Sequence, residues 1–481
     1  MCCCRAKTAR SPAARSSSCW LSRARKAEVV RSQVVSGRSV GRAPKCPGGR
    51  IFGQDPVRSF QHTGILMTLH PVSNPTEPRW TAMEAGLSHA LSADQRRAES
   101  IRLAVDVLDI YCAGGGADRC GHDAGPVLAA VALHDMAPDK RGLVEAALLT
   151  WLESCPQDFA GIGPFGGLSG FLAALRAARR VIPSIDGLYR DVCARTPEAL
   201  AAMTWRSSDV SWRDYDYFMG PSGVIIAGSS EDTAEHMVRP ALDHLAALCV
   251  TPGFEAFRAG DDIDPRSAFN IGRINAGLGH GLAGVCAALI RAMRVFSPDP
   301  GRQAALRRLC DWLEQEMITD ALGLMTWPPV GSDGGPQPTG FNARQAWCYG
   351  APGNAWVLFD GATVLGDTRQ QDRAVRAMQS FCARFDADLY IDDAGADDAL
   401  SLCHGAAGTL ITADAFARHA GLNGAAALRD ALVEYVLARR EAVLELATGN
   451  MSLLSGAGGI AAILLTAAGA DRGWLHHLTL R

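Results

Sequence analysis

Two kinds of hydrophobic pattern alternate along this chain. In the first kind a short stretch is apolar at almost every residue, as in GVCAALIRAM and GIAAILLTAAG. A helix that is apolar all round belongs inside a structure, so these stretches predict buried helices. Each stretch opens at a Gly-x-x-Gly element, and successive elements are 51 to 69 residues apart, at Gly167/Gly170, Gly220/Gly223, Gly281/Gly284, Gly350/Gly353, Gly405/Gly408 and Gly456/Gly459.

The second kind of pattern repeats apolar residues at steps of three and four, with charges between them. Leu306, Leu309 and Leu313 are an example. Such spacing predicts an amphipathic helix with one buried face and one solvent-exposed face. Amphipathic helices of this kind are expected over Thr233–Cys249, Arg302–Thr319, Gln371–Phe385 and Ala426–Leu446.

The alternation predicts an all-α protein of about seven helical hairpins. A first, degenerate hairpin is expected from Ala98–Tyr111 and Pro126–Met136. A closed α/α toroid, a double-layered helical barrel, satisfies the pattern because every buried helix then has neighbours on both sides. Glycines three residues apart share a helix face, and we expect them to let the inner helices approach one another closely near their N-termini.

Reactive side chains fall at equivalent positions of three consecutive repeats. Counted from the first glycine of each element, position −2 is Gly279, Cys348 and Cys403, and position −1 is His280, Tyr349 and His404. If the repeats are spatially equivalent, these residues point into the same end of the central channel. Helix N-termini surround that end, and their partial positive charge favours anions such as a thiolate or an enolate.

Cys348, Cys403 and His404 together predict a catalytic zinc site. Two cysteines and one histidine leave a tetrahedral zinc ion with one open position, which is typical of catalytic rather than structural sites. We therefore expect one Zn2+ per chain. His280 is suited to acid–base catalysis because imidazole transfers protons in both directions near neutral pH, although it would also serve as a simple helix cap.

Other reactive residues have plainer interpretations. A lone cysteine in a helical protein is usually a small buried hydrophobe, and we interpret Cys286, Cys310 and Cys382 in this way. Cys120 and His122 form another potential ligand pair, but it lacks partners. The glycine run at 114–116 lacks the Gly-Lys-Ser/Thr of a P-loop, so nucleotide binding has little support.

Charge is distributed unevenly over the 481 residues. Residues 1–60 hold thirteen Lys and Arg against two Asp and Glu, whereas the remainder holds 34 basic and 48 acidic residues. Phosphate contacts need clustered Lys and Arg, so the acidic body argues against nucleic-acid binding. An acidic body suits a basic peptide substrate.

The first 78 residues differ in character from the rest. They are rich in Arg and Ser, and we expect residues 1–78 to be disordered and residues 79–481 to form the toroid. A transit peptide has this composition, but we favour an overextended reading frame with a true start near Met67 or Met83. Fifteen scattered cysteines and no secretory segment predict a reducing cytoplasm. No apolar run reaches the roughly 18 residues of a spanning helix, so membrane insertion is not expected.

Three strings resemble the lanthionine synthetase C-like family, the cyclases that close thioether rings in lanthipeptides. They are GLGHGLAG, RQAWCYGAPG and SLCHGAAG, and the terminal LLSGAGGI is similar to the family's last repeat. The resemblance covers roughly residues 90–480 and implies a seven-hairpin α/α toroid. Position by position, it implies that Cys348, Cys403 and His404 bind zinc and that His280 is the acid–base histidine.

The resemblance implies further site residues. Arg344 and Tyr349 match an arginine and a tyrosine of the family's site. Asp216, in a weaker string, matches an aspartate of the second repeat, and it either orients a neighbouring histidine or serves only the fold. The Pro- and Gly-rich stretch Met325–Ala343 runs into Arg344, either as a loop at the channel mouth that touches the peptide or as a connector.

The activity that the resemblance implies is a zinc-dependent Michael-type addition. Peptide cysteine thiols would add to dehydroalanine or dehydrobutyrine and form lanthionine or methyllanthionine rings. The substrate is then a dehydrated precursor peptide. Because no dehydratase-like region precedes the cyclase region, we expect a stand-alone enzyme that works with a separate dehydratase and an exporter.

Four alternative functions fit parts of the same pattern. A related enzyme would add glutathione or another small thiol to dehydroamino acids. A zinc-dependent prenyltransferase also uses an α/α toroid, but its Asp-Cys-His ligand set is absent. A toroid glycosidase would need paired carboxylates, for which Asp216 is the one obvious candidate. The non-enzyme alternative is a peptide-binding scaffold with structural zinc.

Overall fold

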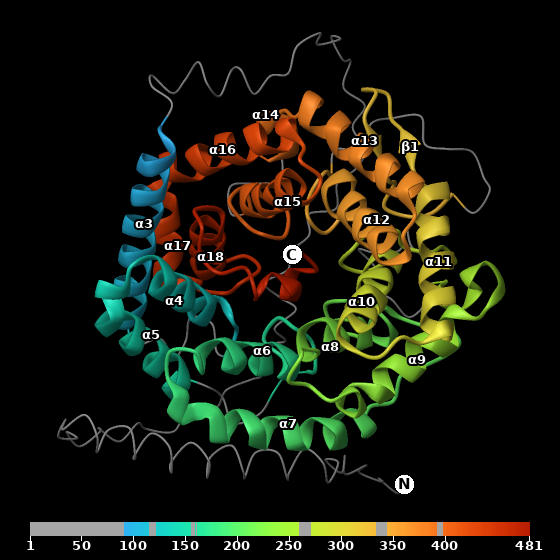
Figure 1. The fold of residues 1–481 in the computed structure, drawn as a ribbon, viewed down its shortest axis with the longest axis horizontal. Helices are drawn as coiled ribbons and strands as arrows, with labels where there is room; N and C mark the ends of the chain where they lie inside the picture. The colour runs from blue at the N-terminus through green and yellow to red at the C-terminus, as the bar shows by residue number, and fades with distance from the viewer. Residues whose placement is uncertain are drawn as a thin grey trace, which may run out of the picture.

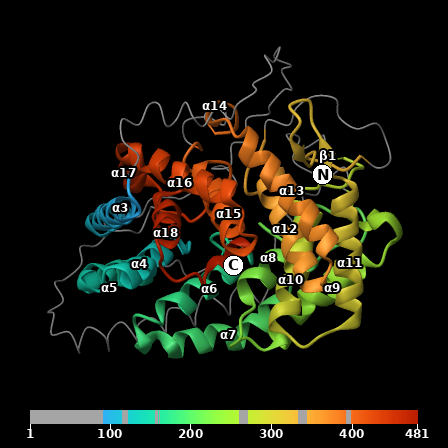
Figure 2. The same cartoon turned by 45° about the horizontal axis from the view of Figure 1, so that its top comes forward.

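The structure is a computed structural model that describes residues 91–114, 122–154, 159, 161–258, 271–332, 344–391 and 398–481. In this part of the chain, helices form an inner and an outer ring (Figure 1). An oblique view shows the same two layers, with α7 outside α6 and α11 outside α10 (Figure 2). The fold is an all-α toroid, as the alternation of patterns predicted.

Seven outer and seven inner helices alternate along the described residues. The inner helices are α4 (Gly125–Met136), α6 (Leu168–Ala178), α8 (Pro221–Gly228), α10 (Leu282–Val295), α12 (Ala351–Leu365), α15 (Ala406–His419) and α18 (Ala457–Ala467). The outer helices are α3 (Ala93–Ala113), α5 (Arg141–Ser154), α7 (Asp186–Ala201), α9 (Arg239–Cys249), α11 (Pro300–Gln315), α13 (Thr368–Arg384) and α16 (Asn423–Ala438).

Shorter elements connect these helices. α17 (Arg440–Gly449) follows α16, and α14 (Ala387–Tyr390) follows α13. β1 (Ile318–Thr319) and β2 (Met325–Thr326) form a small antiparallel pair, in which Ile318 faces Thr326. Turns of 3-10 helix lie at Pro138–Lys140, Pro183–Ile185, Trp212–Asp214, Glu235–Met237, Pro252–Phe257 and Leu475–Leu478.

Both rings close on themselves. Each inner helix contacts the inner helices before and after it, and α18 contacts α4. α16 and α17 both contact α3, which joins the end of the outer ring to its beginning. Burial follows the two sequence patterns, because residues 457–466 of α18 are all buried, whereas α11 buries only Leu306, Leu309, Cys310 and Leu313.

The two glycines of each Gly-x-x-Gly element have different roles. The first is the N-cap of an inner helix in all six elements. The second lies against the backbone six residues earlier: a Cβ on Gly284 would be 2.5 Å from the Leu278 oxygen, and one on Gly353 would be 1.8 Å from the Trp347 oxygen. We expected these glycines to lie against a neighbouring helix. The atoms nearest to the second glycine belong instead to the backbone just before its own helix. The second glycine makes room for the lead-in loop, the six residues before the N-cap glycine, which folds back over its own helix.

Backbone hydrogen bonds hold neighbouring lead-in loops in register. Leu278 and Gly279 donate their N–H groups to the Cys348 carbonyl, at 2.9 and 3.2 Å. Where the last repeat meets the degenerate first one, Leu453 donates instead to the Asp123 side chain, at 2.6 Å. A carboxylate thus replaces a backbone carbonyl at the closure of the ring. These bonds keep the −2 and −1 positions of successive loops at one end of the ring.

The predicted outer helices have different ends in the structure, and three of the differences have a visible physical cause or consequence. The helix predicted over Thr233–Cys249 begins at Arg239, because Pro240 fits only the first turn and its ring would clash with a preceding helical carbonyl. The helix predicted over Arg302–Thr319 ends at Gln315. There the Trp327 indole donates to the Leu313 oxygen at 2.6 Å, which satisfies a carbonyl of the last turn.

The helix predicted over Ala426–Leu446 is broken in two. Arg439, with φ −103° and ψ 28°, separates α16 from α17. Its guanidinium lies over the Tyr435 ring at 3.4 Å. The break turns the chain so that α17 packs on α3 and α18, and the outer ring closes there.

The last residues of the chain lie inside the ring (Figure 1). Tyr217 donates its hydroxyl to the His477 carbonyl. Trp347 and Trp356 donate their indole N–H groups to the carbonyls of Leu478 and Thr479, at 3.0 and 2.8 Å. Inner-ring side chains therefore hold this segment in the centre of the toroid.

Several expectations concern residues outside the described part of the chain. They are the basic head at residues 1–78, the alternative starts at Met67 and Met83, Cys120, and most of the Pro- and Gly-rich stretch before Arg344. Among the helices that are described, none has both the length and the hydropathy that crossing a bilayer would require.

Candidate metal centre

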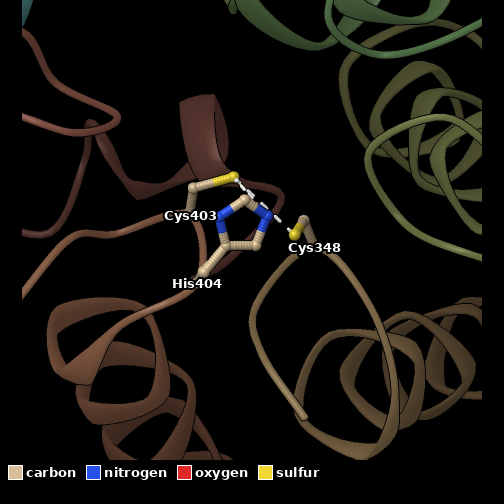
Figure 3. Close-up of side chains that lie close together, drawn as sticks. All are labelled: Cys348, Cys403 and His404. Atoms are coloured by element: carbon tan, nitrogen blue, oxygen red, sulfur yellow. Dashed lines mark hydrogen bonds between the residues drawn. The ribbon is translucent and has the colours of Figure 1, made fainter. Parts of the chain in front are cut away.

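Three predicted site residues come together at the N-terminal ends of α12 and α15. Cys348 lies two residues before Gly350, the N-cap of α12, and Cys403 and His404 directly precede Gly405, the N-cap of α15. Figure 3 shows Cys403 and His404 on one loop and Cys348 on the other, with the two sulfurs and the imidazole converging. Their ligand atoms all lie within 4.8 Å of one another.

The loop that carries Cys348 depends on a glycine at its end. Gly350 has φ 76°, in the left-handed region that disfavours residues with a side chain. A Cβ there would also lie 2.6 Å from the Arg344 carbonyl oxygen. Glycine at this position therefore lets the chain turn sharply between the Cys348 sulfur and the first turn of α12.

The spacing of the three ligand atoms fits a tetrahedral zinc ion. The two sulfurs are 3.7 Å apart, and Cys403 Sγ is 3.5 Å from His404 Nε2. Usual zinc–sulfur and zinc–nitrogen bond lengths at tetrahedral angles place two sulfurs about 3.8 Å apart, and a sulfur and a nitrogen about 3.6 Å apart. A disulfide would need roughly 2.05 Å between the sulfurs. The residues fit zinc and leave its fourth position to a ligand from outside the cluster.

The two thiols of the cluster differ in acidity. Burial opposes ionisation, but the hydrogen bond from Cys403 and the charges of His404 and Arg344 hold the pKa of Cys348 well below its ordinary value. Burial and the neighbouring Cys348 raise the pKa of Cys403 well above that value. Burial also lowers the pKa of His404, yet the charge of Cys348 and the bond to Asp398 outweigh it and raise this pKa to about 9. In the absence of metal, these shifts favour a thiolate at Cys348 and a protonated imidazole at His404.

Asp398 supports His404 from the side away from the sulfurs. His404 Nδ1 lies 3.3 Å from Asp398 Oδ2, while Nε2 faces the two cysteines. The backbone N–H of His404 also donates to Ser401 Oγ at 3.2 Å. A carboxylate on the second ring nitrogen fixes the orientation of a metal-binding histidine. Sequence reasoning missed Asp398, because only the fold of the chain just before α15 brings it back to His404.

Arg344 lies beside the candidate metal ligands. Its Nη1 is 3.3 Å from His404 Nε2, the nitrogen that faces the sulfurs. Its charge also acts on Cys348, Cys403 and Tyr349. The structure therefore places this predicted residue at the cluster, where a guanidinium can attract a negatively charged group.

Asp216 and His280 form the second part of the site. His280 Nδ1 lies 2.6 Å from Asp216 Oδ2, and Asp216 is fully buried. The other oxygen, Oδ1, accepts the backbone N–H groups of Met219 and Gly220 at 2.7 and 2.8 Å. Of the two alternatives for Asp216, the contact with Nδ1 supports the one in which it orients the histidine, while its other oxygen holds the backbone just before α8. His280 keeps Nε2 available for another partner.

Two aromatic rings enclose His280. The Trp212 indole stacks on the imidazole with the ring centroids 4.1 Å apart and the planes at 17°. Phe218 lies on another side, with a centroid distance of 4.7 Å. Sequence reasoning missed Trp212, which precedes Asp216 in a 3-10 turn and carries no motif of its own.

Tyr349 is held by the lead-in loop of the preceding repeat. Its hydroxyl is 2.9 Å from Asn275 Nδ2. Its ring lies so close to Gly277 that a Cβ there would be 2.4 Å from Tyr349 Cε1. Burial raises the pKa of the Tyr349 phenol well above its ordinary value. Asn275 was also missed, although it stands six residues before an N-cap glycine, as Asn450 does.

Backbone and aromatic contacts join the two parts of the site. The N–H of Gly279, the residue before His280, donates to the Cys348 carbonyl at 3.2 Å. Phe218 packs on His280 and also on Trp347, with ring centroids 6.4 Å apart in the second pair. All seven predicted residues therefore belong to adjacent lead-in loops at one end of the ring.

The remaining cysteines lie elsewhere. Cys286, Cys310 and Cys382 are buried, as expected of small hydrophobes. His122 is buried, and its ring packs edge-on against Phe159 at 4.8 Å. Across the described ranges, Cys348, Cys403 and His404 are the one cluster of three or more His, Cys, Asp or Glu side chains with the spacing of a metal site.

Comparisons with known proteins identify the family and the fold. The family described as "Lanthionine synthetase C-like protein" matches residues 123–477. No curated protein sequence matches the chain. Among solved structures, the chain is similar to "Nisin cyclase", with a TM-score of 0.59 and 16% identity. That similarity covers 76% of this chain and 92% of the other, and at this identity it speaks for the fold.

Proposed function

The chain belongs to the lanthionine synthetase C-like family, and from this premise we propose that it is a zinc-dependent lanthipeptide cyclase. It would add a cysteine thiol of a dehydrated peptide to a dehydroalanine or dehydrobutyrine of the same peptide. The product is a lanthionine or methyllanthionine ring. The observation that carries the proposal is the cluster of two sulfurs and one imidazole, at 3.7 and 3.5 Å, which matches a zinc site with an open position.

Cys348, Cys403 and His404 would hold the metal. When bound, zinc would lower the pKa of a peptide thiol, so that the sulfur is a thiolate at neutral pH. Asp398 keeps His404 Nε2 turned toward the sulfurs. Two cysteine ligands donate charge to the metal, which keeps the peptide sulfur nucleophilic.

In the addition itself, the peptide thiolate forms a carbon–sulfur bond to the β-carbon of the dehydroamino acid. The π electrons of the carbon–carbon double bond move toward the amide carbonyl, whose oxygen gains negative charge. Arg344 lies beside the cluster and would stabilise that charge by a charge-assisted hydrogen bond.

A proton must then reach the α-carbon, and His280 is the proposed donor. Asp216 holds Nδ1 and so directs Nε2 toward the substrate. Trp212 and Phe218 shield the imidazole from water and limit its rotation. The added proton balances the one lost by the thiol, so the reaction consumes no other reagent.

The proposed reaction sets conditions on partners and location. The peptide must already contain dehydroamino acids, so a separate dehydratase acts first, and an exporter would remove the finished peptide. A reactive cysteine peptide needs a reducing compartment, for which we propose the cytoplasm. The eight cysteines of the described residues are all free thiols.

The proposal is tested with purified protein, one equivalent of Zn2+ and a dehydrated peptide that contains a cysteine. Ring closure leaves the mass unchanged, so the remaining thiols are alkylated and counted by mass spectrometry. We expect the peptide thiols to disappear much faster than in a control reaction from which the metal is omitted. If they disappear at the background rate, the cyclase proposal is wrong. A mass gain with added glutathione, without ring closure, would instead indicate the small-thiol activity.

Replacing His280 separates proton transfer from metal binding. We expect His280→Ala to keep one zinc per chain and to lose roughly 100-fold or more in kcat. Unchanged cyclisation by this variant would remove His280 from the mechanism while leaving the metal centre in place.

A further inference from the structure

The orientation of the Asn275 side-chain amide is set by its own loop. Asn275 is 1% exposed, and its Oδ1 accepts the Gly277 N–H at 2.8 Å. This bond places the carbonyl end of the amide toward the backbone. The Nδ2 end therefore points to the Tyr349 hydroxyl, 2.9 Å away.

This orientation decides which way the Tyr349 hydroxyl donates. An amide NH2 group donates hydrogen bonds and accepts none, so the phenol oxygen is the acceptor in its bond with Asn275. The hydrogen of the Tyr349 hydroxyl must then point to a different acceptor. The tyrosine ring cannot move away easily, because it lies against the bare backbone of Gly277.

We propose that Asn275 is a positioning residue that turns Tyr349 into a hydrogen-bond donor toward the substrate. The acceptor would be the amide carbonyl oxygen of the dehydroamino acid, which gains charge as the sulfur adds. This inference rests on the proposed cyclase function. It assigns Tyr349 a hydrogen bond that strengthens in the transition state, without any transfer of its proton.

The last repeat contains the same asparagine turn, but there the amide does not contact a tyrosine. Asn450 stands six residues before its N-cap glycine, as Asn275 does, and its Oδ1 accepts the Ser452 N–H at 3.0 Å. Its Nδ2 donates to Ser455 Oγ at 3.2 Å, in a loop without metal ligands. The asparagine turn is thus a shared structural device. Of these two asparagines, only Asn275 has its amide against a tyrosine next to a metal-ligand candidate.

The test replaces Asn275 by a residue of the same shape and opposite hydrogen-bond character. In Asn275→Asp, one carboxylate oxygen still accepts the Gly277 N–H, while the other faces Tyr349 and accepts its hydroxyl hydrogen. The substrate then loses that hydrogen bond. We expect kcat for ring closure to fall about tenfold with KM little changed, and Tyr349→Phe to fall by the same factor.

The double variant distinguishes positioning from a general loss of structure. Asn275→Asp combined with Tyr349→Phe should be no slower than either single variant, because both remove one hydrogen bond. Asn450→Asp is the control, and it should retain the wild-type kcat. Zinc content should stay at one per chain in all four proteins.

Each other outcome has a defined meaning. If Tyr349→Phe keeps the wild-type kcat, the hydroxyl donates nothing and the inference is overturned, whether or not Asn275→Asp folds. Multiplicative losses in the double variant would also overturn it, since Asn275 would then act independently of Tyr349. If the wild-type protein itself closes no rings, the proposed function fails first, which is a distinguishable result.

Discussion

Two buried cysteine pairs in this protein have nearly the same separation but different surroundings. The sulfurs of Cys348 and Cys403 are 3.7 Å apart, and those of Cys286 and Cys310 are 3.8 Å apart. All four side chains are buried. The distance between two sulfurs therefore does not distinguish a metal centre from a packing contact.

The difference lies in the backbone that carries each pair. Cys286 and Cys310 project from the middle of α10 and α11, where Gly361 of α12 makes room for the second sulfur: a Cβ there would lie 2.6 Å from Cys310 Sγ. Burial and the bond to Cys310 raise the pKa of Cys286 well above its ordinary value. This pair behaves as two small apolar side chains.

Cys348 and Cys403 instead lie in loops just before helix N-termini. There, a histidine follows the second cysteine, Asp398 orients it, and Arg344 adds a positive charge. These groups lower the pKa of Cys348 despite its burial. In this protein, charged and polar groups converge on the pair that lies in loops, whereas the sulfurs of the other pair lie against each other between packed helices.

The largest expected effect separates the two pairs directly. Cys403→Ala should lose stoichiometric zinc and at least roughly 1,000-fold in ring-closure rate, because two remaining ligands cannot complete a tetrahedral site. Cys310→Ala should keep both. Zinc is measured by elemental analysis of purified protein, and ring closure by thiol alkylation. A fully active, zinc-free Cys403→Ala protein would end the zinc proposal.

The next effect is the pH dependence of zinc binding. Zinc needs neutral His404 and two thiolates, but below pH 9 His404 holds a proton, and the pKa of Cys403 is also raised. Binding should release about two protons, so the apparent affinity should rise with pH by about 100-fold per unit between pH 6 and 8. Competition with a chromophoric chelator measures this slope. A flat profile would show that the ligands are already deprotonated.

A smaller effect is expected from the carboxylate beside the histidine. Asp398→Asn keeps the shape but removes the charge that holds His404, so zinc affinity should fall by about 10- to 100-fold. The site should still bind one zinc at saturating metal. Affinity equal to the wild type would mean that the lead-in loop alone orients His404.

The smallest expected effect is on the stability of the protein when the Cys286–Cys310 pair is changed. Cys310→Ala removes one buried sulfur next to Gly361, and the free energy of unfolding should fall by about 1 kcal/mol. Chemical denaturation of the zinc-loaded protein checks this value. A much larger loss, or loss of zinc, would show that the second pair is coupled to the metal centre and would break the comparison.

Much of the candidate site was predictable because it repeats. The −2 and −1 register of the sequence predicts that Cys348, Cys403 and His404 lie together, and in the structure their ligand atoms are within 4.8 Å of one another. The residues that support them were not predictable. Asp398 and Trp212 occupy positions whose residue type does not recur between repeats. They reach His404 and His280 only because of the path that their loops take.

By itself, the amino-acid sequence determined the closed double ring of helices and the side chains with reactive groups. Hydrophobic periodicity and glycine spacing are local properties, and they recur in each repeat, so the pattern can be followed without coordinates. Tertiary structure alone decided which groups support those side chains: the glycines fold each loop back on its helix, Asn275 meets Tyr349, and Asp216 holds both His280 and the backbone just before α8. These contacts join residues from different loops, and their distances depend on the closure of the whole ring.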